Sequence, residues 1–338
     1  MFRTVESKWS ALRRACPVVV VAAVAVGLAM PACAKDKKPT IPTQTVVTVV
    51  SNTHDGAAAP VVTSADVIVK DGGKPAQVLG WQPMPSQATT QLVVLIDDAL
   101  RGRVSANFSE LSSFIAQLPP SVQVAVGYMQ YGRAVIASGF AAGKIMAAKS
   151  VRVPTGIAGV NASPYFCISD LSKRWPDDGH PATMRQVLMI TDGIDRYFEP
   201  PRYNPEDPYV GTAITDAQKA RMMVSTIYFR DIGLPDLGNH GAFVGNDYLV
   251  QVAEATGGKD YYEGMGDPVT FIPMLKDFKQ RMASTYLLTY AAQGSGLHYV
   301  KISTKVHGVR LEAPDHVVVG QQLPMGAAPT TSVAQLTK

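Results

Sequence analysis

Two apolar runs in this chain each lead directly into aspartate. Residues 92–96 are all apolar and are followed by Asp97 and Asp98, and residues 187–190 are followed by Thr191-Asp192-Gly193. An uninterrupted apolar run of this length predicts a strand that is buried on both faces. Parallel strands end at one edge of a sheet, where α/β proteins bind ligands, so we expect the aspartates to share a site there.

The segments around these runs alternate between helix and strand patterns. Residues 105–118 carry apolar side chains at helical intervals and stop at Pro119-Pro120, and residues 122–129 and 134–136 predict an antiparallel pair of strands. The other expected elements are strands at 224–229 and 260–262 and helices at 141–149, 157–171 in part, 214–223, 246–256 with Asn246 as N-cap, and 268–282. This alternation predicts an α/β fold built on one layered sheet.

Shorter strand patterns flank the α/β region. Strands are expected at 45–50, 65–69 and 77–81 on one side of it and at 286–291 and 298–306 on the other. A Gly-rich turn over residues 70–74 closes a hairpin. A β unit this small needs another surface to pack on, so the two flanking groups of strands are expected to pair with each other. Polar or proline-containing connections are expected at 35–43, at 83–90 and after Gly320.

Composition limits the classes of function. The chain has 338 residues, of which 46% are hydrophobic and 17% are charged, as in a globular protein with a sizeable core. Its net charge of +4 includes a surplus of three within the first 34 residues, which leaves the remainder close to neutral. Nucleic-acid binding requires a basic stripe on the folded domain, so no nucleic-acid partner is expected.

The first 34 residues have the pattern of an export signal. A basic region that ends at Arg13-Arg14 precedes an apolar run over residues 17–30, and Ala32-Cys33-Ala34 follows. This pattern predicts cleavage after Ala34 and a periplasmic or extracellular protein. The alternative is a membrane-anchored lipoprotein with its lipid anchor at Cys33. The apolar run is too short for a comfortable membrane span.

The strand that ends at Asp97, the loop Pro154-Thr155-Gly156 and the segment 187–193 resemble a von Willebrand factor type A domain. With its flanking β segments, the chain is similar, more narrowly, to the exported von Willebrand A-related proteins of Acidobacteria. The resemblance implies a doubly wound, Rossmann-like, mostly parallel sheet with helices on both faces, and a small β extension from the flanking segments. The implied parts are a signal peptide at 1–34, an N-terminal β segment and linker at 35–90, the A-like domain at 91–283, C-terminal strands at 284–320 and a flexible tail at 321–338.

The same resemblance implies a metal-ion-dependent adhesion site that holds Mg²⁺. Asp97, Thr155 and Asp192 match its ligand positions, whereas Ala99 and Arg101 stand where the family has two serines. Mg²⁺ prefers oxygen ligands, so losing two of them and gaining a cation predicts a degenerate site. Three alternatives stay open: no functional metal, weak Mg²⁺ binding, or an Arg101 guanidinium in the place of the metal. No other cofactor is expected.

A binding function at this edge is what the resemblance implies. The residues expected to contact a protein partner are Asp97, Arg101, Thr155, Asp192, Tyr197 and Tyr203. Tyr197, Tyr203 and Tyr209 lie among prolines after the second apolar run, where aromatic side chains either anchor a partner or pack onto their own domain. We interpret the chain as an exported, non-enzymatic protein for protein–protein or surface interaction.

No strong catalytic motif is present in the sequence. The segment 139–144 is one residue short of a phosphate-binding loop and lacks its serine or threonine. Cys167, between two apolar residues, is interpreted as a small core residue, and no small-molecule substrate is indicated. Two alternatives to a binding protein stay open: a hydrolase that uses a loop histidine such as His240 with an acid at the sheet edge, and a structural component of the envelope.

Overall fold

The computed structural model has two units, residues 1–37 and 38–338, and the residues that it describes belong to the second. It describes residues 39–52, 60–85, 88–100, 102–156, 163–195, 197, 207–230, 238–264 and 266–324, with side chains for all of these except 238–243. The expected signal peptide and the expected anchor at Cys33 therefore lie outside the described residues. Within the part of the chain that the structure describes, no helix combines the length and the apolar character needed to cross a membrane.

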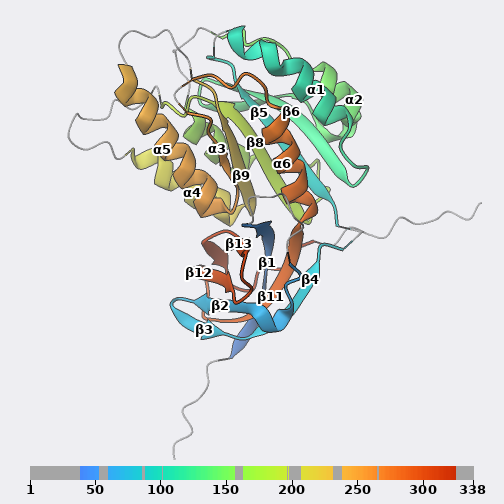
Figure 1. Cartoon of the computed structure of the whole chain (residues 1–338), viewed down its shortest axis with the longest axis vertical. Coiled ribbons are helices and arrows are strands. Elements are labelled where there is room, and N and C mark those ends of the chain that lie inside the picture. The colour runs from blue at the N-terminus through green and yellow to red at the C-terminus, as the bar shows by residue number, and fades with distance from the viewer. Residues whose placement is uncertain are drawn as a thin grey trace, which may run out of the picture. The chain divides into compact units, whose positions relative to one another are not determined.

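A six-stranded sheet lies at the centre of the α/β region (Figure 1). Its strands are, in spatial order, β7 (Arg133–Ser138), β6 (Val122–Gln130), β5 (Thr90–Asp97), β8 (Met184–Thr191), β9 (Met222–Tyr228) and β10 (Asp260–Tyr261). Neighbouring strands are parallel except β6 and β7, which form the antiparallel pair expected from the sequence. The chain order reverses between β5 and β8, as in doubly wound sheets.

Helices cover both faces of this sheet (Figure 1). One face packs against α1 (Phe108–Ala116), α2 (Gly143–Lys149) and α6 (Ile272–Ala283), and the other against α3 (Pro164–Lys173), α4 (Pro208–Lys219) and α5 (Gly238–Thr256). Short 3-10 segments are η1 (Ser64–Asp66), η2 (Gly102–Asn107) and η3 (Phe140–Ala142). The predicted α/β class is confirmed, and the arrangement is the one that the resemblance to von Willebrand A domains implies.

The apolar run at 92–96 explains why β5 is the central strand. Leu92, Val94 and Ile96 belong to the core under α1 and α6, whereas Val93 and Leu95 belong to the core under α3 to α5. All eight residues of β5 are buried. Burying one aliphatic side chain contributes about 1.5–3 kcal/mol, so this strand is firmly fixed and its carboxyl end is well positioned.

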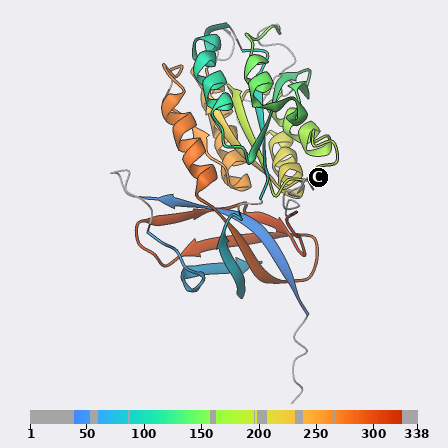
Figure 2. The ribbon, with the colours of Figure 1, turned by 90° about the vertical axis from the view of Figure 1, so that its right-hand side faces the viewer.

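The flanking segments form two four-stranded sheets around a core of their own (Figure 2). One sheet has the order β13 (Val309–Glu312), β1 (Thr40–Ser51), β11 (Thr285–Gln293) and β4 (Val78–Pro83), and the other β14 (His316–Val318), β12 (Leu297–Thr304), β2 (Val67–Asp71) and β3 (Lys74–Ala76). β1 pairs antiparallel with β11, so strands from before and after the α/β region pair as predicted. This confirms the expected β extension.

The structure corrects the expected start of the helix at 246–256. α5 begins at Gly238, so Asn246 lies inside the helix and is not its N-cap. The side-chain amide of Asn246 instead donates to Oδ2 of Asp260 at 3.3 Å. The short polar side chain of Asn246 therefore joins the helix to β10.

Candidate functional site

The carboxyl ends of β5 and β8 lie side by side at the point where the strand order reverses. Ile96 is paired with Ile190, so Asp97 at the end of β5 lies next to Thr191 at the end of β8, and Asp192 follows at once. Ligands of doubly wound sheets bind in the crevice at this reversal. The structure places Asp97 and Asp192 at neighbouring strand ends, and both side chains are buried.

Hydrogen bonds from the chain itself hold the Asp97 carboxylate. Its Oδ1 accepts the N–H of Ala99 at 2.9 Å, and its Oδ2 accepts the hydroxyl of Thr191 at 2.8 Å. The Thr191 hydroxyl also accepts the N–H of Gly193 at 3.1 Å. Thr191 thus links the two strand ends, a role that the sequence analysis did not assign to it.

The loop that carries Thr155 forms its hydrogen bonds with the carboxylate of Asp98 and not with that of Asp97. The Oδ1 atom of Asp98 accepts the Thr155 N–H at 2.9 Å, and its Oδ2 accepts Nε2 of Gln130 at 2.6 Å. The Thr155 hydroxyl lies 3.5 Å from the same Oδ2. A Cβ atom on Gly156 would lie only 2.5 Å from the Asp98 carbonyl oxygen, so only glycine allows the loop to come this close.

Arg152 supplies the positive charge at Asp98. Its Nη1 lies 2.7 Å from Oδ1 of Asp98, and its guanidinium lies 3.8 Å from the centre of the Tyr128 ring. The Tyr128 hydroxyl accepts the Arg152 N–H at 2.6 Å and donates to the Ser150 carbonyl at 2.9 Å. Burial raises the pKa of Asp98, but the hydrogen bonds from Arg152, Thr155 and Gln130 outweigh it and leave the pKa below its ordinary value. Asp98 is therefore an internally neutralised carboxylate.

Arg152 and Gln130 were not singled out from the sequence. The only local signal for Arg152 is its position two residues before the Pro154-Thr155-Gly156 loop. Arg101 and Tyr203, two of the predicted contact residues, lie outside the described residues. The interpretation of the Arg101 guanidinium as the replacement for a metal therefore stays a prediction.

Asp192 and Gly193 form the turn after β8. The Oδ1 atom of Asp192 accepts the N–H of Ile194 at 2.9 Å, and the hydroxyl of Tyr165 donates to the carbonyl of Gly193 at 2.6 Å. Gly193 has a φ of 71°, which favours glycine. The turn directs the chain towards Asp195, whose Oδ2 accepts the hydroxyl of Ser163 at 2.9 Å.

A second buried carboxyl, Asp207, lies near Asp195 at the start of α4. Its Oδ1 caps the helix by accepting the Tyr209 N–H at 2.8 Å. Burial raises the pKa of Asp207 to about 6. The hydrogen bond from the Tyr209 N–H lowers this pKa only in part, and the nearby Asp195 carboxylate raises it further. Burial raises the pKa of the Tyr165 hydroxyl well above its ordinary value, and the negative charges of Asp207, Asp195 and Asp192 add to this shift.

Asp207→Asn should raise the stability of the chain at neutral pH and not in mild acid. Because the folded pKa lies above the unfolded value, the contribution of this group to stability is full below about pH 4 and is lost as pH rises through about 6. Asparagine keeps the cap and removes the charge, so we expect a gain of roughly 1–3 kcal/mol at pH 7.5 that shrinks towards pH 4. Urea denaturation at both pH values measures it. The exposed Asp178→Asn is the control, and an equal gain for both variants would contradict the assignment.

The predicted aromatic residues that the structure describes pack onto their own domain. The ring of Tyr197 lies 5.3 Å from that of Phe166, and the ring of Tyr209 lies 4.5 Å from it. This is the second of the two interpretations left open by the sequence. Tyr197 nevertheless remains 45% exposed, so one face of its ring is accessible to a partner.

Several exposed apolar side chains lie on the loops of this edge. Val153 follows Arg152 directly and lies beside Gly102, and the Val269 carbonyl accepts Nδ2 of Asn107 at 3.1 Å. The ring of Tyr262, after β10, lies 5.3 Å from that of Tyr228, the last residue of β9. We call these exposed residues the apolar rim: Tyr131, Val153, Tyr197, Tyr262 and Val269.

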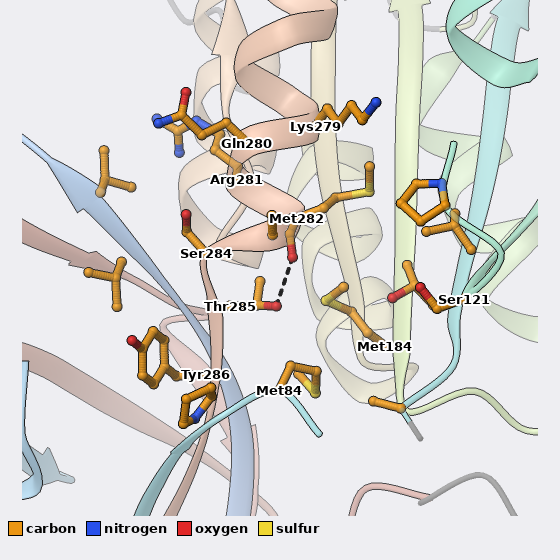
Figure 3. A pocket seen from close by; sticks show the side chains of 18 of the residues that line it. Met84, Ser121, Met184, Lys279, Gln280, Arg281, Met282, Ser284, Thr285 and Tyr286 are labelled. Atoms are coloured by element: carbon orange, nitrogen blue, oxygen red, sulfur yellow. Dashed lines mark hydrogen bonds between the residues drawn. The ribbon is translucent and has the colours of Figure 1, made fainter. Parts of the chain in front are cut away.

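A cavity of about 790 Å³ lies at the opposite, amino ends of the strands (Figure 3). Met84, Met184 and Met282 contribute to its lining. Its charged side chains are Asp277, Lys279 and Arg281, and Nε of Arg281 already pairs with Asp277 at 2.7 Å. The cavity thus combines apolar and polar lining residues with one ion pair.

The cysteine and histidines considered for catalysis have the following environments. Cys167 is fully buried, and burial holds the pKa of its thiol well above the ordinary value, as the core interpretation requires. His298 pairs with Asp71 at 2.8 Å within the flanking sheets, and the side chain of His240 lies outside the described residues. Across the residues that the structure describes, no three histidine, cysteine, aspartate or glutamate side chains gather as a metal cluster.

No family model matches the chain, and no curated protein matches its sequence. Among solved structures it is similar to the human COPII-coat protein Sec24c (10% identity, TM-score 0.40), covering 69% of this chain and 44% of that one. It is also similar to an aerotolerance-related membrane protein of Bacteroides fragilis (11%, TM-score 0.39, 57% and 98%) and to the SpRpn10 VWA domain (12%, TM-score 0.37, 56% and 94%). The chain thus spans less than half the length of the Sec24c chain.

Proposed function

We propose that this chain is an exported, non-enzymatic binding protein that contacts a protein partner through the carboxyl edge of its six-stranded sheet. The observation that carries the proposal is the apolar rim around charges that are already paired within the chain. Protein interfaces combine exposed aromatic and aliphatic side chains with arginine in this way. The narrower resemblance to exported von Willebrand A-related proteins of Acidobacteria supports export and a binding role.

The proposed contact does not depend on a resident metal. Mg²⁺ requires near-octahedral oxygen ligands, whereas Ala99 has no side-chain oxygen and Thr155 faces Asp98. Asp97 accepts hydrogen bonds from Ala99 and Thr191. These donors do not fit a Mg²⁺ ion, which supports a degenerate site over weak Mg²⁺ binding.

Aspartate on the apolar rim should abolish partner binding. The double variant Val153→Asp/Val269→Asp places two charges on exposed positions, so the fold should survive while an apolar contact is lost. We expect at least a tenfold loss of one specific protein in a pull-down from the native envelope with the full chain. Leu79→Asp, a position on β4 that is as exposed as Val153, is the control and should retain that protein.

Three other results would decide against the proposal. An unchanged set of retained proteins with the rim variant would show that this edge is not the contact. If the parent chain retains no protein specifically, a structural component of the envelope becomes the better interpretation. A hydrolase would instead be indicated by turnover that Asp97→Asn removes.

A further inference from the structure

The guanidinium of Arg152 is both fixed and accessible. Its Nη1 donates to Oδ1 of Asp98 at 2.7 Å and to the Val153 carbonyl at 2.9 Å, and its Nη2 donates to Oδ2 of Asp98 at 3.4 Å. A guanidinium has five N–H groups, so Nε and one Nη2 hydrogen have no acceptor among the described residues. The Arg152 side chain is 38% exposed, whereas that of Asp98 is 3% exposed.

Two residues hold this guanidinium in one position. Asp98, directly after β5, pairs with it, and Tyr128 of β6 places its ring under the guanidinium and accepts the Arg152 backbone N–H with its hydroxyl. Stacking on an aromatic ring and pairing with a carboxylate reduce the entropy that the side chain would lose on binding. Arg152 is therefore a preorganised cation at the edge of the sheet.

We propose that the Arg152 guanidinium replaces the divalent cation of this edge and is the group to which a carboxylate of the partner binds. A carboxylate that meets a fixed guanidinium forms charge-assisted hydrogen bonds with the two N–H groups that remain. The neighbouring Val153 supplies an apolar contact beside this charge. The binding of a partner carboxylate by Arg152 rests on the proposed function, whereas the replacement of the metal by Arg152 does not.

A metal ion could bind the Asp98 carboxylate only by displacing the hydrogen-bond donors that it has in this structure. Arg152, Gln130 and the Thr155 N–H all donate to its carboxylate. A Mg²⁺ ion at Asp98 would have to displace these donors, including the threonine that the metal site of the family uses as a ligand. The chain itself thus supplies the positive charge of this edge. It comes from Arg152 at Asp98, whereas the sequence pointed to Arg101 at Asp97.

Thermal unfolding of the full chain tests the replacement of the metal. After treatment with a chelator, the parent should have the same Tm with and without millimolar Mg²⁺. Arg152→Ser should lower Tm by about 4–8 °C, because it leaves Asp98 buried without its counter-ion. The double variant Asp98→Asn/Arg152→Gln should recover most of that loss. A Tm of the parent that rises with Mg²⁺, or an Arg152→Ser variant that unfolds like the parent, overturns the proposal.

A titration with a small carboxylate tests whether Arg152 binds carboxylates. The probe is N-acetyl-aspartate N-methylamide, and the signal is the arginine Nε–H resonance followed by NMR. The Arg152 resonance should shift and saturate in the millimolar range, while that of the exposed Arg133 should only drift in proportion to the concentration. If the Nε–H resonances of Arg152 and Arg133 shift equally and without saturation, Arg152 does not bind the carboxylate specifically, and this part of the proposal is overturned.

Failure of this inference can be told apart from failure of the proposed function. If a partner is lost with Val153→Asp/Val269→Asp but kept with Arg152→Gln, the edge is the contact and Arg152 is not its anchor. If Arg152 binds the probe while Val153→Asp/Val269→Asp keeps every partner, Arg152 is a carboxylate-binding site but this edge is not the contact of the proposed function. If both hold, the partner stays bound in chelator and Arg152→Gln weakens its binding about tenfold or more.

Discussion

Alanine at position 193 should destabilise the chain by at least about 4 kcal/mol. Gly193 has a φ of 71°, which costs an L-residue about 1–2 kcal/mol. A Cβ atom there would also collide with the Gly245 carbonyl oxygen and would lie 2.7 Å from Cγ of Leu249. The turn cannot move away easily, because Tyr165 holds the Gly193 carbonyl at 2.6 Å. Urea denaturation of the purified variant measures the loss.

Gly211→Ala is the matched control for this substitution. Gly211 lies in α4, is exposed, and would have no atom within 4 Å of an added Cβ. The same change should therefore stabilise the chain by about 0.5–1 kcal/mol, because alanine is the better helix former. Gly193→Ala within about 1 kcal/mol of the parent would show that the turn after β8 relaxes more readily than its contacts indicate.

Gly193 and Gly245 act as a pair that sets the geometry of the edge. A Cβ atom on Gly245 would collide with the Asp192 carbonyl oxygen, just as one on Gly193 would collide with the Gly245 carbonyl. The turn after β8 therefore lies directly on α5 without a side chain between them. Close backbone packing thus adds to the hydrogen bond from the Ile194 N–H in positioning Asp192.

The fold was predictable from the sequence where burial is two-sided. The runs at 92–96 and 187–190 are apolar without interruption because helices cover both faces of β5 and β8. The antiparallel β6–β7 pair was predictable from its short connection. Local pattern and final environment agree at these places, and such agreement makes single-sequence inference succeed.

The prediction was wrong about where β1 begins and where the C-terminal tail begins. Residues 40–43 were expected in a polar lead, but they begin β1 and pair with residues 290–293 of β11. Gln321 was assigned to the flexible tail, yet its carbonyl accepts the Gln44 N–H at 2.9 Å. Thr43 is fully buried and Pro42 lies within the strand, so the local pattern of residues 40–43 carries no signal of the long-range contact.

The positions of Asp97 and Asp192 at neighbouring strand ends were predictable, whereas the hydrogen-bond partners of Asp98 were not. Asp97 and Asp192 follow strands whose ends must be neighbours in such a sheet, so their position was predictable. Asp98 follows the same apolar run, but no role was assigned to it; it lies beyond the end of β5. The donors from Arg152 and Gln130 come from a loop and a strand more than 30 residues away, which no local pattern indicates.

Leu92→Ala and Leu95→Ala should each cost about 3–4 kcal/mol, although the two residues point to opposite faces of β5. Both leucines are fully buried, and each truncation leaves a cavity in a different core. A strand with one face in water would lose stability at only one of the two positions. Urea denaturation measures both, with Leu79→Ala on the half-exposed β4 position as the control at below about 1 kcal/mol. Unequal losses at positions 92 and 95 would mean that one helix layer packs loosely, and the edge that β5 supports would then lack the rigidity that a preorganised Arg152–Asp98 pair requires.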